Sequence, residues 1–182
     1  MTDEAAKAGE FPRPVRLDTL GAGERAITIA AEAGERAALA RRFGLVSLDR
    51  LEASIRLKRA GPAVHAEGSL HAELVQSCVA TGDPLPLALD ETFVLRFLPE
   101  EMVDAATEEL ELSEEDCDTV PYTGGAIDIG EAVAETLALA LPPFPRGPHA
   151  DAALRAAGVL SEGEVEGGPF AALKGLRDRL KG

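Results

Sequence analysis

Three long stretches of the chain alternate apolar and polar residues, which is the pattern of a strand with one buried face. They cover residues 46–57, 63–78 and 85–98, and the turn sequences Gly61-Pro62 and Gly82-Asp83-Pro84 separate them. A break in the alternation near Arg50 predicts a β-bulge in the first stretch. Strands that follow one another through short turns predict an antiparallel meander.

Shorter elements precede the meander. Residues 13–20 and 26–30 have the pattern of short strands. Residues 34–43 predict a helix, because strong helix formers run there up to Gly44, which stands where a C-terminal cap glycine belongs. Arg41 and Arg42 fall in the last turn of this helix, where the helix dipole favours cations.

A second helix is predicted over roughly residues 130–141, after a short strand at 126–130. Asp128 is its candidate N-cap, Glu131 has capping-box spacing to Asp128, and Pro142-Pro143 end the helix. Its apolar stripe consists of Val133, Leu137, Ala140 and Leu141. Residues 145–168 are rich in Pro, Gly and Glu and predict a mostly flexible segment, and residues 169–180 predict a last short helix.

Together these elements predict one α+β domain, mainly an antiparallel β meander or a partly closed barrel, with two to three short helices. We expect a flexible N-terminus at residues 1–10 and the folded domain at residues 11–142, which includes an acidic loop at 100–118. Residues 143–182 are then a Pro/Gly-rich tail that ends in a short helix.

Charge divides the chain unevenly. The 182 residues carry 18 Lys and Arg against 32 Asp and Glu, a net charge of −14, which excludes a broadly basic nucleic-acid binder. Residues 1–60 hold eleven bases and nine acids, a net of +2, so residues 61–182, with seven bases and 23 acids, have a net of −16. Between Glu100 and Asp118 there are ten acids and no base. Such a block is usually a solvated loop, and the alternative is an arm for a basic partner.

The partner hypothesis selects two groups of residues. The acidic candidates are Glu108, Glu109, Glu111, Glu114, Glu115 and Asp116. The basic candidates are Arg36, Arg41 and Arg42 on the first predicted helix. These arginines are spread around the helix rather than aligned, so solvated side chains are the plainer interpretation and limited RNA contact is the alternative.

Catalytic and metal motifs are weak. The sequence has no Gly-x-Ser-x-Gly and no phosphate-binding glycine loop. His65 and His71 would lie about 20 Å apart along one strand, too far to share a metal, and Cys78 has the opposite parity. We therefore expect no catalytic residue, cofactor or metal. No apolar run has membrane-spanning length and the first ten residues lack a signal pattern, so we expect a cytoplasmic protein with no membrane partner.

Several segments together resemble the YceD family, the large ribosomal RNA subunit accumulation proteins. The resemblance rests on residues 35–45, 75–81, 93–97 and 130–142, with 169–173 similar to the closing segment of the family. The motif-matching residues are Gln76, Cys78, Glu131 and Glu135. Many members have Cys-x-x-Cys where this chain has Cys78-Val79-Ala80-Thr81, so the chain resembles a cysteine-poor branch and no metal is carried over.

The resemblance implies a non-enzymatic, bacterial factor for the accumulation or processing of large-subunit ribosomal RNA during ribosome biogenesis. Its expected partner is a ribosomal protein, an rRNA-processing factor or an assembly factor. Two alternatives stay open: a protein-interaction module unrelated to ribosomes, and, least favoured, a hydrolase or nuclease that uses Cys78 or acidic residues. The sequence leaves the direct partner, the molecular activity and the oligomeric state open.

Overall fold

The main element of the fold is a five-stranded sheet with the strand order β2-β3-β4-β5-β6. The computed structural model of the chain describes residues 9–21, 23–106 and 118–159. The strands of the sheet are β2 (Arg25–Ala30), β3 (Ser47–Ala60), β4 (Ala63–Ser77), β5 (Pro84–Pro99) and β6 (Asp118–Tyr122). β2, β3 and β4 pair antiparallel, whereas β6 runs parallel to β5. The sheet is open, with β2 at one edge and β6 at the other, so of the two predicted arrangements the meander forms.

The predicted alternation decides which face of the sheet is buried. In β4 the even positions from Val64 to Leu74 point inward, and only Gly68 among them lacks a side chain. The ring of Phe93 on β5 lies over Gly68, where an added Cβ would come within 2.9 Å of that ring. The pairing register of β3 shifts between Leu48 and Arg50, which confirms the predicted bulge.

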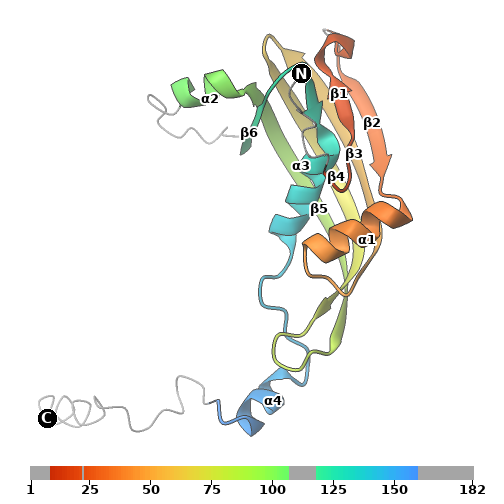
Figure 1. Cartoon of the computed structure of the whole chain (residues 1–182), viewed down its shortest axis with the longest axis vertical. Coiled ribbons are helices and arrows are strands. Elements are labelled where there is room, and N and C mark those ends of the chain that lie inside the picture. The colour runs from red at the N-terminus through yellow and green to blue at the C-terminus, as the bar shows by residue number, and fades with distance from the viewer. Residues whose placement is uncertain (1–8, 22, 107–117, 160–182) are drawn as a thin grey trace, which may run out of the picture. The chain divides into compact units, whose positions relative to one another are not determined.

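Two helices and a small second sheet accompany the large sheet (Figure 1). α1 (Ala33–Arg42) links β2 to β3, and α3 (Ile129–Ala140) lies near β5. β1 (Pro14–Arg16) pairs antiparallel with β7 (Ala126–Asp128), and this two-stranded sheet leads directly into α3. Their buried side chains belong to one aliphatic core with those of the large sheet, including Leu39, Leu57, Leu70 and Leu137.

Both predicted helices form close to their expected ends. Gly44 follows α1 with a φ of 66°, the left-handed conformation that favours glycine after a helix. The side chain of Asp128 caps α3 by accepting hydrogen bonds from the backbone N–H groups of Gly130 and Glu131. Glu131 does not return the bond that a capping box requires, because its carboxylate binds Arg42 instead.

Three local predictions differ from the structure. The predicted strand 13–20 is a strand only over β1, because residues Leu17–Thr19 turn into a short 3₁₀ helix. The acidic stretch 100–118 is not a loop at its ends: Glu100–Ala106 form helix α2, whose first-turn carboxylates suit the helix dipole, and Asp118 begins β6. The predicted flexible segment 145–168 contains helix α4 (Ala150–Ala156), which four alanines favour.

The chain divides into two compact units. The first consists of residues 1–76 and 84–143, and it holds both sheets and helices α1 to α3. The second consists of residues 77–83 and 144–182, and it holds α4. The predicted helix at 169–180 lies outside the described residues.

Candidate functional site

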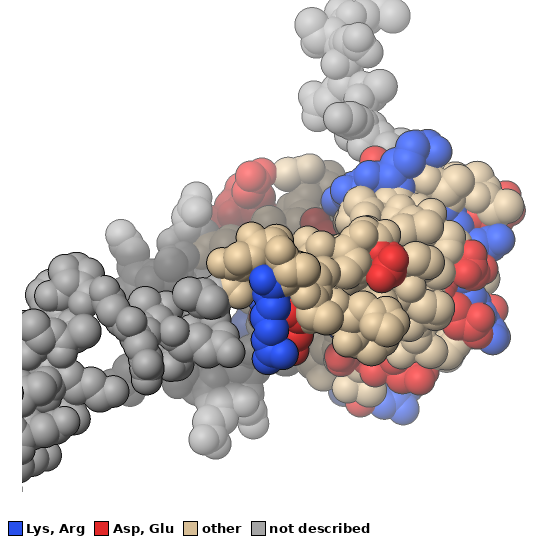
Figure 2. All heavy atoms as spheres, turned by 90° about the horizontal axis from the view of Figure 1, so that it is seen from below, with Lys and Arg blue, Asp and Glu red and all other residues tan. Residues whose placement is uncertain are grey.

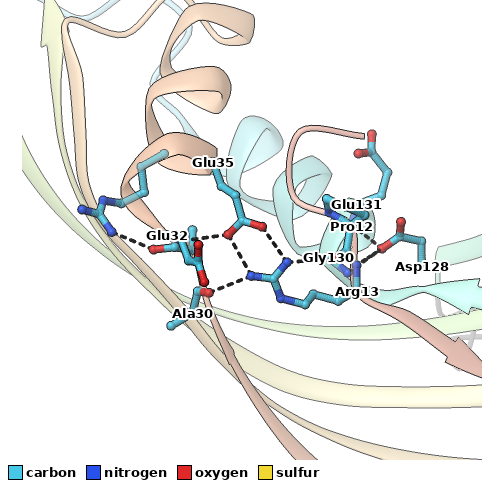
Figure 3. Close-up of polar contacts among 10 residues, drawn as sticks. Pro12, Arg13, Ala30, Glu32, Glu35, Asp128, Gly130 and Glu131 are labelled. Atoms are coloured by element: carbon cyan, nitrogen blue, oxygen red, sulfur yellow. Dashed lines mark hydrogen bonds and ion pairs between the residues drawn. The ribbon is translucent and has the colours of Figure 1, made fainter. Parts of the chain in front are cut away.

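Within the first unit, Arg13 connects the N-terminal segment to α1 (Figure 3). Its guanidinium donates to both carboxylate oxygens of Glu35 on α1, at 2.7 and 2.8 Å, and to the carbonyl oxygen of Ala30 at 3.0 Å. It also lies 4.3 Å from the centre of the Phe11 ring. The two-pronged hydrogen bond from Arg13 lowers the pKa of Glu35 below its ordinary value. We call this arrangement of Arg13, Glu35 and Asp128 the clasp.

Asp128 joins the clasp to the start of α3. One of its carboxylate oxygens accepts from the backbone N–H of Arg13 at 2.9 Å as well as from the first turn of α3. Gly130 makes this approach possible, because a Cβ there would lie 1.8 Å from the carbonyl oxygen of Phe11. Three segments distant in the sequence therefore meet at one capped helix end.

The three arginines predicted to contact a partner have different surroundings. Arg42 donates to Glu131 on α3 at 2.6 and 3.0 Å and to Glu10 at 2.9 Å. Glu131 is the main cause of the raised pKa of this guanidinium. Arg36 donates to the carbonyl oxygen of Ala31 at 2.7 Å. Arg41 is exposed, and it makes no ion pair within the described part of the chain.

The motif-matching residues serve different purposes. The side-chain amide of Gln76, near the end of β4, donates to the carbonyl oxygen of Pro142 at 3.1 Å. This hydrogen bond connects β4 to the residues that follow α3. Glu131 holds Arg42, as described above. Glu135, one turn further along α3, is exposed and makes no hydrogen bond or ion pair to any described residue. Of these two glutamates, Glu135 is the one without a partner among the described residues.

Cys78 belongs to the second unit and is only 3% exposed. Its sulfur accepts from the backbone N–H of Gly147 at 3.4 Å, and this bond, followed by one from Thr81, lowers the pKa of the thiol to about 7. The hydroxyl of Thr81 donates to Asp83 at 2.8 Å. The residues that the structure describes contain no group of three His, Cys, Asp or Glu side chains able to hold a metal ion.

A groove of about 540 Å³ lies where β6 begins beside β5, with α3 as its other wall. Sequence reasoning did not select it. We call it the β5 groove, and it is lined by Glu91, Thr92, Phe93, Val94, Leu95, Asp118, Val120, Ala132, Glu135, Thr136, Leu139 and Ala140. The sequence signal that could have pointed to the groove is Leu139, an apolar residue outside the stripe predicted for α3, and in the structure it is 85% exposed.

The outer face of the sheet carries mixed charges. His71 on β4 lies 2.8 Å from Asp90 on β5 and 3.4 Å from Glu73, and Asp90 is the main cause of its raised pKa. Arg56 pairs with Glu67 across the β3–β4 register at 2.8 Å. Seen from below in Figure 2, much of the described surface is uncharged, and along one side basic and acidic side chains alternate. Such a surface lacks the concentrated positive charge that phosphate binding requires.

The predicted acidic contact residues lie outside the described residues. They are Glu108, Glu109, Glu111, Glu114, Glu115 and Asp116. Their role as a partner contact stays a prediction. No helix within the described ranges is long and apolar enough to cross a membrane.

The open mixed sheet, the helices packed with it and the acid-lined groove at its edge define an acidic α+β protein with a groove beside its β5 strand. The chain belongs to the YceD family: the model of the large ribosomal RNA subunit accumulation protein YceD matches residues 66–177, more than half of the chain. That range contains three of the four stretches on which the resemblance rested, whereas 35–45 precedes it. No curated protein and no solved structure matches the chain.

The family match divides the observed features. Gly130, Glu131, Glu135 and the whole β5 groove lie inside the matched range. Arg13, Glu35 and Arg42 precede the matched range. The residues that bind Asp128 and Glu131 from the N-terminal side therefore come from the part of the chain that the family model does not match. The name of the family connects its members with accumulation of the large ribosomal RNA subunit.

Proposed function

We propose that this protein is a non-enzymatic factor that supports accumulation and processing of large-subunit ribosomal RNA during ribosome assembly. The observation that carries the proposal is the match of the YceD family model over residues 66–177. The molecular role is that of a binding factor, and a groove between α3, β5 and β6 offers a surface for it.

The direct partner is a protein with a basic region: a ribosomal protein, an rRNA-processing factor or an assembly factor. A net charge of −14 repels phosphate and attracts cationic protein segments. The ten acids between Glu100 and Asp118 extend the attraction beyond the β5 groove. Any RNA contact is local and falls to Arg36 and Arg41, since Arg42 is engaged by two carboxylates.

A genetic experiment tests the proposed function. Cells that lack the protein are compared with cells that carry the restored gene by sucrose-gradient profiles and by quantifying large-subunit against small-subunit ribosomal RNA. We expect the large-subunit RNA and particle to fall relative to the small subunit, and restoration of the gene to reverse the loss. An unchanged ratio in cells without the protein would refute the proposal.

A biochemical experiment tests the protein partner. The purified chain is used to capture partners from lysate at low and moderate salt, with and without ribonuclease. We expect ribosomal or assembly proteins that remain bound after ribonuclease and leave as salt rises, because charge attraction is screened. Recovery of RNA alone, lost on ribonuclease treatment, would contradict a protein-mediated role.

A further inference from the structure

One side of β5 is only partly covered by a neighbouring strand. β6 pairs with β5 from Leu95, opposite Asp118, to Pro99, opposite Tyr122. Residues 84–94 of β5 have β4 as a neighbour, and on their other side no strand within the described ranges pairs with them. A strand edge of this kind leaves backbone groups available to an added strand, although Pro84 and Pro86 have no N–H to donate, so the usable edge is residues 87–94.

The β5 groove lies at the end of this edge nearest β6, over residues 91–94, and its lining includes exposed apolar side chains. Val94 on β5 is 49% exposed and Leu139 on α3 is 85% exposed, although both are large apolar side chains. Ala132 and Ala140 of α3 also line the groove, and their side chains are small. Apolar side chains left together at an unpaired strand edge mark a surface that a partner covers.

The charges around the groove have one sign. Glu91, Asp118 and Glu135 line it, and no Lys, Arg or His is among its lining residues. None of the three carboxylates has a hydrogen-bonding or ionic partner among the side chains that the structure describes. Elsewhere on the first unit the carboxylates of Glu35, Glu67 and Glu131 are each held by an arginine.

These observations select one kind of occupant. We propose that the β5 groove binds an extended basic segment of a protein partner, which adds to β5 as a strand beside residues 87–94. Apolar side chains of the segment cover Val94 and Leu139, and its Lys or Arg side chains reach Glu91, Asp118 and Glu135. The proposal rests on the proposed function in one respect: the partner that supplies the segment is a basic ribosomal or assembly protein.

Other occupants fit the charges less well. Nucleic acid would bring phosphates against three carboxylates. A second copy of this chain, with a net charge of −14, would bring like charges together, and so would the acidic stretch of the chain itself. Charge complementarity therefore favours a cationic peptide segment.

The test uses a fluorescent peptide of about ten residues with alternating Lys and Val, the length that spans the unpaired part of β5. Fluorescence anisotropy follows its binding to the full chain. One matched peptide replaces each Lys by Glu, and a second carries N-methyl groups on consecutive backbone nitrogens, so that neither of its edges can donate to a sheet. We expect the Lys peptide to bind and both matched peptides to bind at least about tenfold more weakly.

Variants locate the binding site. Leu139→Arg places a positive charge on the apolar wall, and the double variant Glu91→Gln/Glu135→Gln removes two carboxylates. Each should weaken the Lys peptide about tenfold. The controls are Val46→Arg, an equally conspicuous apolar residue of 59% exposure away from the groove, and Glu101→Gln on α2, and both should bind like the original chain. Circular dichroism confirms that every variant is folded.

Several outcomes would overturn the proposal. They are failure of the Lys peptide to bind, equal binding of the Glu or N-methylated peptide, and unchanged binding in folded Leu139→Arg. A concentration-dependent dimer in analytical ultracentrifugation that Leu139→Arg abolishes would make a second copy the occupant instead. Binding with the expected variant pattern alongside normal ribosomal RNA in cells lacking the protein would retain the groove and reject the proposed function. Loss of large-subunit ribosomal RNA in cells lacking the protein, without the expected peptide binding, would retain the proposed function and reject the groove.

Discussion

Two glutamates on α3, one helical turn apart, have opposite surroundings. Glu131 binds the guanidinium of Arg42 and so connects α3 to α1, next to the clasp. Glu135 faces the β5 groove and has no partner among the described residues. Both lie inside the range that the family model matches, so that range contains one glutamate paired within the fold and one without a partner among the described residues. The paired carboxylate stabilises the fold, and the carboxylate without a described partner is the candidate for binding.

The largest effect should come from the glycine at the start of α3. Gly130→Ala would place its Cβ against the carbonyl oxygen of Phe11, a backbone atom that cannot rotate away. We expect a loss of about 3 kcal/mol in the free energy of unfolding, measured by urea denaturation. Gly34→Ala in α1 is the control, because nothing lies within 4 Å of its added Cβ, and it should stabilise by about 0.5–1 kcal/mol. Equal stability of the two variants would show that the N-terminal segment does not pack at this helix end.

The clasp should come next. Arg13→Met keeps most of the apolar stem but removes both bonds to Glu35, and we expect it to cost about 2 kcal/mol in the free energy of unfolding. The matched variant Arg16→Met breaks a pair with Asp18 in which both side chains are exposed, so it should leave the free energy of unfolding nearly unchanged. Similar costs for the two variants would mean that the clasp is an ordinary surface ion pair.

The clasp also predicts the direction of a pH dependence. The folded state lowers the pKa of Glu35, chiefly through the hydrogen bonds from Arg13. A carboxyl with a lowered folded pKa binds fewer protons folded than unfolded, so its contribution to stability is complete above its ordinary pKa and disappears as the pH falls through the folded value. Denaturation between neutral and acid pH should therefore show a steeper loss of stability in the original chain than in Glu35→Gln. Parallel curves would contradict a linked Glu35.

The smallest effect on stability should come from the glutamate in the groove. Glu131→Gln loses the charge that holds Arg42 and should cost about 0.5–1 kcal/mol, whereas Glu135→Gln should stay within about 0.5 kcal/mol of the original chain. Binding of the Lys peptide should reverse the order, with only Glu135→Gln weakened. If Glu135→Gln is the more destabilising of the two, Glu135 has a structural role and the contrast fails.

The sheet was predictable because its signal is local. Alternation of apolar and polar residues predicted β3, β4 and β5, and even the irregularity near Arg50 is visible in the sequence as a change of parity. Asp128 was predicted as a helix cap because a cap and its helix are adjacent in the chain. The short helix α4 was missed because its alanines lie between Pro- and Gly-rich sequences that favour irregular structure.

The clasp and the β5 groove depend on contacts between distant residues. Arg13 meets Glu35 across 22 positions and Asp128 across 115, and no sequence spacing announces either pair. The groove exists because β6 joins β5 in parallel and begins only opposite Leu95, which the sequence does not specify. Arg42 was predicted to contact a partner, but the sequence does not show that its guanidinium pairs with Glu131 on α3 and with Glu10.

The most direct test of the contrast between the clasp and the groove is a residue-resolved titration of the chain with the alternating Lys and Val peptide, followed by amide NMR. The account predicts that the signals that move belong to β5 residues 87–94, to Glu135 and to Leu139, and that those of Arg13, Glu35 and Glu131 stay in place. Shifts concentrated at the clasp and α1, with β5 unchanged, would contradict it.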